Sequence, residues 1–335
     1  MNAPRVSVII PAYNSGPLVE EAIGSALAQT RPPAEVVVIN DGSTDDTAER
    51  LARFGPPVRV IRQANGGVSA ARNRGLAAAT GAFVAFLDAD DVWHPDKLRR
   101  QLEAFAKRPE LGLLGTLTVP WPGTFPAEPE VRRESDLLWR QASRPAGDTP
   151  RPGGLGPRQE AGVVTPVPLD DLVVRNRFVT SSVVMRRELA EQVGEFDGSL
   201  HGPEDFDYWL RAAALAPVAN LEEPLTGYRD LGGSLSKQAA RMEDGMRRIL
   251  GKLERAGVFR GRRSLRRKAW AYFHYSCAYM HGAAGHRREA LRNAVRSVWR
   301  YPAPFGRDEV RVPFGRARLV VAAVRRSLFA GGATC

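Results

Sequence analysis

Phe83-Val84-Ala85-Phe86-Leu87-Asp88-Ala89-Asp90-Asp91 is the stretch of sequence that decides the fold. Five apolar residues run into three carboxylates, as in a strand that is buried on both faces and ends at the edge of a parallel sheet. Ligands of open α/β sheets bind at that edge. In an extended backbone Asp88 and Asp90 would share one face, and two carboxylates suffice for a hard divalent ion that also binds phosphates. An Asp-rich turn after a buried strand is the alternative.

The sequence on either side of this stretch alternates strand and helix patterns. Three earlier apolar runs each lead into turn residues and then into a segment with helical spacing: residues 6–10, 36–39 and 58–61. A further helical stripe of apolar residues follows the fourth strand. This order predicts an α/β fold, with a Rossmann-like, mostly parallel sheet and helices on both faces.

Polar residues suited to holding a nucleotide follow the predicted strands. Asp41 could accept a hydrogen bond from a base or a ribose. Gly66 and Gly67 open a helix, so their N–H groups could bind a phosphate, with Arg72 one turn further on. Ordinary loop chemistry explains each residue singly, so their combination carries the prediction.

Several sequence motifs of other enzyme classes are missing. The chain has no Gly-x-Gly-x-x-Gly, no phosphate loop with Gly-Lys-Ser/Thr, no Gly-x-Ser-x-Gly and no His-Glu-x-x-His. Dehydrogenases, P-loop enzymes, α/β hydrolases and zinc proteases therefore lose their main support.

The composition, 43% apolar and 25% charged, is that of a globular protein. No apolar run approaches the length of a membrane span, and Cys277 and Cys335 show no metal-binding or redox spacing. We therefore expect a cytoplasmic protein. The net charge of +11 comes from the C-terminal part, since residues 237–335 hold 23 Lys and Arg against six Asp and Glu, whereas residues 1–236 hold 25 against 31. Because no nucleic-acid-binding motif accompanies this charge, we expect no nucleic-acid partner.

Five motifs in a fixed order now make the chain resemble a known family, the inverting family-2 glycosyltransferases of the GT-A fold. They are Val8-Ile9-Ile10-Pro11-Ala12-Tyr13-Asn14, Asn40-Asp41-Gly42-Ser43-Thr44-Asp45, Asn65-Gly66-Gly67 with Ala71-Arg72-Asn73, Asp88-Ala89-Asp90, and Gly202-Pro203-Glu204-Asp205. The resemblance covers about half of the chain. It departs at Asn40, where the family commonly has a second Asp.

The resemblance implies that seven residues bind the nucleotide sugar: Pro11, Ala12, Tyr13, Asp41, Arg72, Asp88 and Ala89. It implies that Asp90 ligates a divalent metal, Mn²⁺ or Mg²⁺, on the donor diphosphate, and that Asp205 is the general base. Glu204 would hold the acceptor. Leu231 stands where many relatives have a His, so donor phosphates and water are expected to complete the metal's ligands.

The chain divides into four predicted parts. Residues 1–117 would form the nucleotide-sugar-binding half of the GT-A domain, and residues 169–235 its acceptor and catalytic half. Residues 118–168, which hold 10 of the 25 prolines, are predicted to be a flexible insertion or a loop that covers the acceptor. Residues 236–335 would form a basic, helical C-terminal tail.

The predicted tail contains a helical hairpin that turns around Gly285, with an aromatic face on its first helix. Residues 319–326 form an apolar segment flanked by Arg, which could dock on the protein or lie in a membrane interface. Peripheral contact with an anionic membrane, at the inner face of the plasma membrane, is therefore one expectation for the tail.

The predicted function is metal-dependent transfer of a hexose, with inversion, from a nucleotide-diphosphate sugar to a saccharide or lipid-linked acceptor. We take a UDP-sugar as the first donor to consider and cell-envelope polysaccharide or glycoconjugate synthesis as the setting. Two alternatives stay open. One is a nucleotidyltransferase, which would release pyrophosphate, and the other is an inactive sugar-nucleotide-binding protein with a basic, membrane-associating tail.

Overall fold

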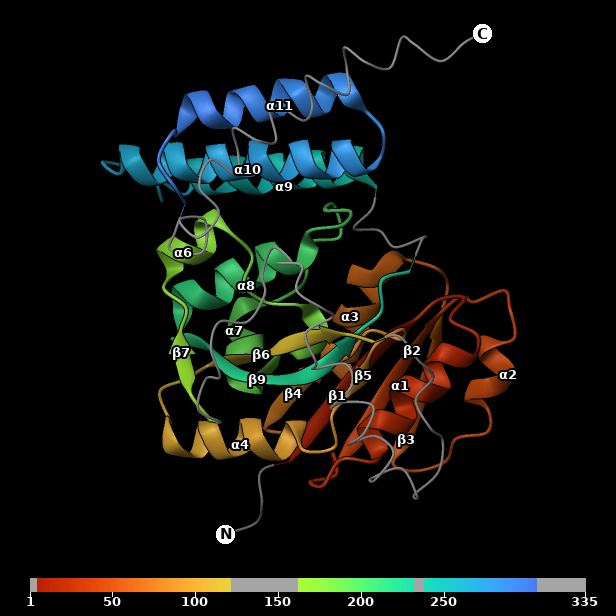
Figure 1. The fold of residues 1–335 in the computed structure, drawn as a ribbon. Coiled ribbons are helices and arrows are strands. Elements are labelled where there is room, and N and C mark those ends of the chain that lie inside the picture. Colours follow the sequence, from red (N-terminus) through yellow and green to blue (C-terminus); the bar gives the residue numbers. More distant parts are fainter. Residues whose placement is uncertain (1–4, 122–161, 232–237, 306–335) are drawn as a thin grey trace, which may run out of the picture. The chain divides into compact units, whose positions relative to one another are not determined.

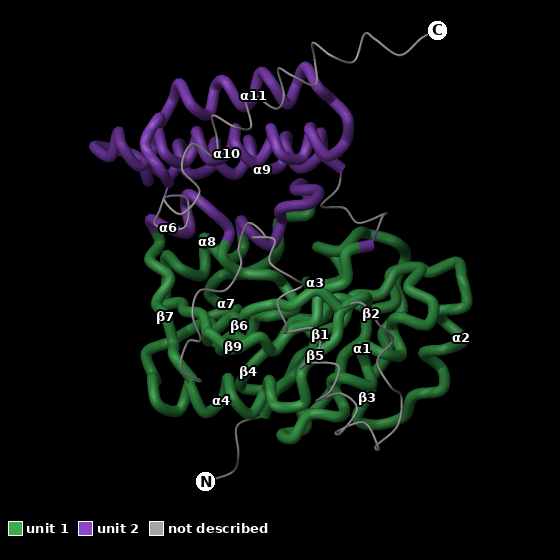
Figure 2. The backbone as a smooth tube through the Cα atoms, in the orientation of Figure 1, with its two compact units in different colours: residues 1–169, 177–198, 208–230 green, residues 170–176, 199–207, 231–335 purple. Residues whose placement is uncertain are grey.

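A computed structural model describes residues 5–121, 162–231 and 238–305 of the chain (Figure 1). The chain forms two compact units (Figure 2). The first unit comprises residues 1–169, 177–198 and 208–230, and the second comprises residues 170–176, 199–207 and 231–335.

Four parallel strands form the first half of the sheet, in the order β3-β2-β1-β4. Helices connect them in the predicted alternation (Figure 1). In chain order the elements are β1 (Val6–Ala12), α1 (Pro17–Leu27), β2 (Glu35–Asp41), α2 (Thr47–Leu51), β3 (Val58–Gln63), α3 (Gly67–Ala78) and β4 (Phe83–Phe86). Because the strands are parallel, their carboxyl ends meet at one edge of the sheet.

The second half of the sheet is mixed. It continues from β4 in the order β8-β6-β9-β5, and β7 also pairs with β9. Six of the nine described strands run in one direction, and β5, β7 and β8 run in the opposite direction. The bounds are β5 (Val92–Trp93), α4 (Lys97–Lys107), β6 (Leu113–Pro120), β7 (Val164–Pro166), β8 (Val184–Arg186), α7 (Arg187–Val193) and β9 (Val218–Tyr228). The predicted α/β fold with a mostly parallel sheet is confirmed.

Helices cover both faces of the parallel strands. Val36 and Val38 of β2 belong to a core that includes apolar residues of α1 and α4, whereas Val37 and Ile39 pack with Ala71 of α3 on the other face. Helix α3 lies close to β1, since a Cβ added at Gly75 would come within 2.3 Å of the Ile9 side chain. Residues that alternate along one strand thus serve two separate helix layers.

A cluster of aromatic rings forms a further part of the core of the first unit. Phe196 stacks on Tyr208 with ring centroids 3.9 Å apart, and Phe86 of β4 meets Trp209 edge-on at 5.7 Å. Tyr208 and Trp209 belong to α8 (Glu204–Leu215), which begins in the second unit and continues in the first.

The second unit contains three long helices: α9 (Ala239–Arg255), α10 (Arg263–Ala283) and α11 (Arg287–Arg300). It also contains most of the short helix α6 (Leu169–Val174). Helices α10 and α11 form the predicted hairpin, and Gly285 in the turn has a φ of 79°. Within the described residues, no helix combines the length and the apolar character that a bilayer crossing requires.

Some sequence-based expectations differ from the structure. Residues 178–185 alternate in sequence as a strand would, but the structure has the 3₁₀ turn η1 (Thr180–Ser182) followed by the short β8, because hydroxyl residues interrupt the apolar run. The predicted aromatic face of α10 is not one face, since Phe273 is buried and Tyr279 is 60% exposed. The ends of the predicted insertion belong to β6 and β7, whereas residues 122–161 and 319–326 lie outside the described residues.

Candidate functional site

The three carboxylates after β4 lie on a turn. Strand β4 ends at Phe86, and the Asp91 N–H donates to the Asp88 carbonyl at 3.1 Å. The sequence argument from alternating faces of an extended strand was therefore wrong, because the backbone turns where the carboxylates begin. The turn is compatible with an ion site, because Asp88 and Asp90 stay partly exposed while Asp91 is buried.

Asp91 holds this turn in place from inside the protein. Its side chain is buried and accepts hydrogen bonds from the Ser181 hydroxyl at 2.6 Å and from the Arg229 backbone N–H at 3.0 Å. Ser181 Oγ in turn accepts the Asp88 N–H at 3.0 Å, and the Arg229 guanidinium donates to the Asp90 carbonyl at 2.9 Å. Burial, followed by the charges of Asp90 and Asp88, raises the pKa of the Asp91 carboxyl well above its ordinary value.

Sequence reasoning missed Ser181 and Arg229 as supports of the turn. Ser181 lies in η1 and Arg229 directly follows β9, so both come from later parts of the chain. The polar run Thr180-Ser181-Ser182 inside an apolar segment was the available signal.

Arg72 and Asp88, both predicted to contact the nucleotide sugar, lie together. The Arg72 guanidinium donates to Asp88 Oδ1 at 2.7 Å and lies over the Phe196 ring, 5.6 Å from its centroid. The Arg72 side chain is 4% exposed and that of Asp88 is 29% exposed. The pair thus has a buried cation and a carboxylate that reaches solvent.

Asp90 lies in a partly buried and acidic environment. Burial and then the nearby charge of Asp88 raise the pKa of Asp90 to about 6, although Arg229 and Arg72 oppose this shift. A divalent cation would relieve this repulsion between carboxylates. No group of three His, Cys, Asp or Glu side chains with metal-binding geometry occurs among the described residues. Two carboxylates suffice for an ion such as Mg²⁺ or Mn²⁺ that keeps several waters and binds donor phosphates, so Asp88 and Asp90 are compatible with such an ion.

Asp41 at the end of β2 caps helix α3. Its carboxylate accepts the N–H groups of Gly66 at 2.9 Å and Gly67 at 2.8 Å, together with the Gln63 amide at 2.7 Å. The prediction that the Gly66 and Gly67 amides are available to a phosphate was wrong, because the Asp41 carboxylate occupies them. Any contact of Asp41 with a nucleotide stays a prediction.

Hydrogen bonds join the loop after β1 to the loop after β2. Asn14 Oδ1 accepts the Thr44 N–H at 2.8 Å, and the Asn14 N–H donates to Ser43 Oγ at 3.1 Å. Gly42 has a φ of 74°, and a Cβ there would come within 2.8 Å of the Asn65 backbone nitrogen, so only glycine fits. Tyr13 is 51% exposed at this edge and can stack on a planar ligand.

The other residues predicted to bind the nucleotide sugar in these loops have small side chains with little exposure. Ala12 and Ala89 are buried and Pro11 is half-buried. Asn40 Oδ1 accepts the Ser43 N–H at 3.0 Å. A carboxylate oxygen could accept the same hydrogen bond, so the Asn in place of the family's Asp preserves the shape of this loop.

Asp205 lies in the first turn of α8, in the second unit. Its Oδ1 accepts the Phe206 N–H at 2.6 Å, and the Asn176 amide donates to its Oδ2 at 3.4 Å. Asn176, which sequence reasoning did not single out, thus helps to orient the carboxylate. The placement of Asp205 relative to Asp88 and Asp90 stays a prediction.

The two acidic neighbours of Asp205 are bound within the same unit. Glu204 is 4% exposed and accepts the Gly202 N–H at 3.1 Å. Asp207 is also 4% exposed and pairs with Lys252 of α9 at 2.8 Å. Asp205 is the most accessible of the three carboxylates, as a base that receives a proton from a ligand must be.

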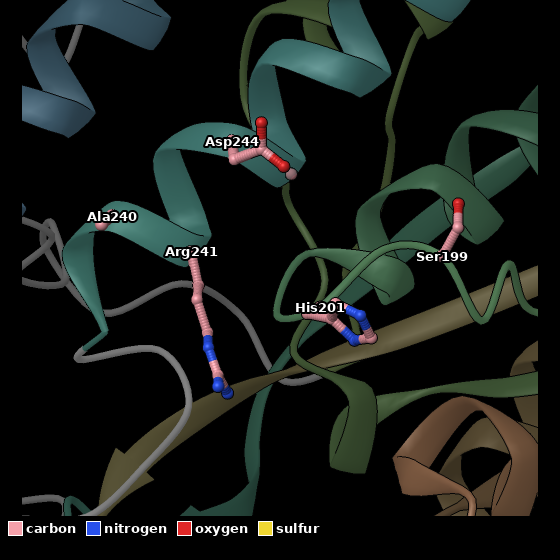
Figure 3. Close-up of a pocket in the computed structure, with 6 residues that line it drawn as sticks. Ser199, His201, Ala240, Arg241 and Asp244 are labelled. Carbon is pink, nitrogen blue, oxygen red and sulfur yellow. The ribbon is translucent and has the colours of Figure 1, made fainter.

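A cavity of about 230 Å³ lies in the second unit beside the loop that leads to Glu204 and Asp205. Ser199 and His201 of this loop line it together with residues of α9, and Figure 3 shows the side chains of His201, Arg241 and Asp244. The exposed His201 and Arg241 give the cavity hydrogen-bond donors that suit hydroxyl or anionic groups.

Comparison with known sequences gives three findings. A family model described as Glycosyl transferase family 2 matches residues 7–147. An uncharacterized glycosyltransferase of Nostoc sp. is 45% identical over 249 residues, which cover 70% of this chain and 68% of that protein. TuaG of Bacillus subtilis, named for teichuronic acid biosynthesis, is 40% identical over 109 residues, which cover 31% of this chain but only 43% of TuaG.

Two solved structures resemble the fold. The structure of residues 1–349 of TarS from S. aureus, in complex with UDP-GlcNAc, has a TM-score of 0.52 and 16% identity, and the match covers 89% of each chain. A mannosyltransferase from Pyrobaculum calidifontis, in complex with GDP-Man and Mn²⁺, has a TM-score of 0.54 and 21% identity. That match covers 98% of this chain and 88% of the mannosyltransferase.

Proposed function

The chain belongs to glycosyltransferase family 2 and has the GT-A fold, and on this premise we propose that it transfers a hexose, with inversion, from a nucleoside-diphosphate sugar to an acceptor hydroxyl. The observation that carries the proposal is the arrangement after β4. There the Arg72–Asp88 pair adjoins Asp90, a second carboxylate whose pKa is raised by burial and by the charge of Asp88.

The donor would bind at the carboxyl edge of the parallel strands. Tyr13 would stack on the base, Asp88 would accept the ribose hydroxyls, and Arg72 would orient the Asp88 carboxylate toward them. Asp41 would fix the position of the N-terminus of α3, which lies at the same edge of the sheet as the proposed nucleotide site. Asp90 would hold Mn²⁺ or Mg²⁺, which when bound neutralises charge on the departing nucleoside diphosphate.

Asp205 would act as the general base. It would take the proton from the acceptor hydroxyl as that oxygen attacks the anomeric carbon from the face opposite the leaving group, which inverts the configuration. A positioned base of this kind contributes about 10²–10⁴-fold to the rate. The Asn176 amide would keep the receiving carboxylate oriented.

The acceptor would be a saccharide or a lipid-linked saccharide that enters beside Glu204. The cavity lined by His201 and Arg241 has the donors to bind such a group. The name of TuaG supports a setting in cell-envelope polysaccharide synthesis. The UDP-GlcNAc complex of TarS supports a UDP-sugar as the first donor to test, and the mannosyltransferase makes GDP-Man the second.

Slow hydrolysis of the donor tests this proposal without knowledge of the acceptor. The full-length protein is incubated with UDP- and GDP-sugars, with Mn²⁺ or with chelator, and the nucleotide product is identified. We expect nucleoside diphosphate to appear with Mn²⁺ and to be lost in Asp90→Asn. Formation of pyrophosphate from a nucleoside triphosphate and a sugar phosphate would identify a nucleotidyltransferase instead. Donor binding with no turnover in any acceptor extract would favour a sugar-nucleotide-binding protein.

A further inference from the structure

Helix α11 carries five residues on one side: Arg288, Arg292, Val295, Arg296 and Trp299. At 3.6 residues per turn, these positions fall within an arc of about 100°. All five side chains are exposed, with Trp299 79% and Val295 50% accessible. We name this set the α11 outer face.

The opposite side of α11 packs on α10 through small and polar residues. Ala290, Asn293, Ala294 and Ser297 are buried there. The Ser297 hydroxyl donates to a carbonyl of α10 at 2.7 Å, and Asn293 Oδ1 lies 2.7 Å from a His274 ring nitrogen. In an ordinary surface helix the large apolar residues face the core. In α11 the buried side instead carries small and polar residues, and the single aromatic residue of the helix, Trp299, is exposed.

The charge of α11 is strongly positive. The helix contains five Arg and a single Glu. In the part of the chain that the structure describes, Arg288, Arg292 and Arg296 form no ion pair. Near the end of the helix, burial and then the charges of Arg266 and Arg296 lower the pKa of Arg300. Uncompensated charge of one sign attracts surfaces of the opposite sign.

We propose that the α11 outer face docks on an anionic phospholipid bilayer. Trp299 and Val295 would enter the interface between headgroups and acyl chains, where indole rings are favoured. Arg288, Arg292 and Arg296 would contact the phosphates, their aliphatic stems lying along the membrane surface. This inference does not require the transfer reaction, although it would hold the protein where a lipid-linked acceptor is found.

Charge favours a bilayer over the two other occupants that this surface could have. Residues 306–335 follow α11 in the chain and carry six Arg against two acidic residues, so they would be repelled. A second copy in a symmetric dimer would place arginines against arginines. Anionic headgroups are the one occupant of the three with complementary charge.

The test is co-sedimentation of the full-length protein with two kinds of vesicle: phosphatidylcholine alone, and an equal mixture of phosphatidylcholine and phosphatidylglycerol. We expect binding only to the mixed vesicles, and weaker binding at 1 M than at 0.1 M salt, because the screening length falls from about 10 Å to about 3 Å. The double variant Arg292→Glu with Arg296→Glu should lower the partition coefficient by about tenfold or more, and Trp299→Ala should lower it several-fold. The matched control is Lys107→Glu with Arg108→Glu, which makes the same charge change on the first unit and should have little effect.

The fluorescence of Trp299 distinguishes a bilayer from the two other molecules or segments that could cover the α11 outer face. Subtraction of the Trp299→Phe spectrum from that of the wild type isolates Trp299 emission, which should shift to the blue on addition of the mixed vesicles. Equal loss of binding in the control and in the α11 variants would overturn the proposal. Emission from Trp299 that is already blue-shifted without vesicles would also overturn it and assign the face to residues 306–335. A dimer in ultracentrifugation that Trp299→Ala dissociates would assign it to a second copy. An unchanged melting temperature shows that each variant is folded.

Discussion

The Asp91 carboxylate accepts the hydroxyl hydrogen of Ser181 at 2.6 Å, although 90 residues separate them in the chain. The same Ser181 oxygen accepts the N–H of Asp88, so the bond ties the carboxylate turn to the η1 segment. The position of Asp88, which is expected to bind the donor, therefore depends on the buried Asp91, which is not expected to contact the donor.

Asp91→Asn should loosen this turn. An amide can accept from Ser181 or from the Arg229 N–H with its oxygen, but its NH₂ group then faces the other donor, and an unsatisfied buried donor costs about 1–3 kcal/mol. We expect a lower melting temperature and weaker Mn²⁺-dependent donor binding, both measured on folded protein by thermal shift and calorimetry. Ser181→Ala leaves the Arg229 bond intact and should have the smaller effect. Wild-type stability and affinity in Asp91→Asn would mean that the protonated carboxyl, not the charged one, holds the turn.

The pKa of Asp90 gives a prediction about pH. Burial and Asp88 raise this pKa from 3.8 to about 6 in the folded protein, so the folded state binds the proton more tightly than the unfolded state does. The free energy of unfolding of the metal-free protein should therefore fall as the pH rises from about 4 to about 6. Asp90→Asn removes this titration, and the difference between the two unfolding curves, measured in urea with chelator, isolates it. A difference that does not change with pH would contradict the raised pKa.

Asp41→Ala should have two separate effects. The Gly66 and Gly67 N–H groups lose their acceptor, which as the loss of a helix cap costs about 2 kcal/mol of stability. Nucleotide binding should also weaken, even with chelator present, if Asp41 contacts the nucleotide. Gln63→Ala is the matched control, because it removes one donor to Asp41 and leaves the cap. Urea unfolding and calorimetry with UDP measure the two effects, and unchanged stability would show that water replaces the cap.

The sequence predicted the strands and helices that show a pattern of apolar residues within one continuous segment. The apolar strand β1, its Asn14 turn and the stripe of Val19, Ile23 and Ala26 in α1 form one continuous pattern, so strand and helix could be placed in order. The resemblance then brought together Arg72 and Asp88, which the structure finds in contact.

The sequence could not show contacts between distant segments. The partners of Asp91 are 90 and 138 residues away, and no local spacing relates them. Gly66 and Gly67 looked available to a phosphate because the sequence does not reveal that Asp41 points toward them. The antiparallel pairing of β8 with β4 and β6 was also hidden, because a strand pattern does not reveal which strands it pairs with.

Lys97 gives a prediction outside the site. The side chain is completely buried, its Nζ lies 2.9 Å from Gln101 Oε1 and 4.1 Å from the centroid of the Trp93 ring, and burial lowers its pKa well below the ordinary value. A lysine that is neutral when folded and charged when unfolded gains stability as the pH rises. Relative to Lys97→Met, the wild type should gain up to about 1.4 kcal/mol per pH unit as the pH rises toward the ordinary lysine pKa of about 10. A constant difference in urea unfolding would show that Lys97 stays charged against the Trp93 ring.

Asp205→Asn tests the base. Asn keeps an oxygen that can accept the Phe206 N–H, but it cannot take a proton, so transfer should fall by about 10²–10⁴-fold while donor affinity stays near wild type. The readout is nucleoside diphosphate released with acceptor present, next to donor binding measured separately. Asp207→Asn is the matched control in the same helical turn. It breaks the pair with Lys252, so it should lower the melting temperature and leave transfer by the folded protein largely intact. Near-normal transfer in Asp205→Asn, together with its loss in Glu204→Gln or in Asp207→Asn, would move the base to that other carboxylate.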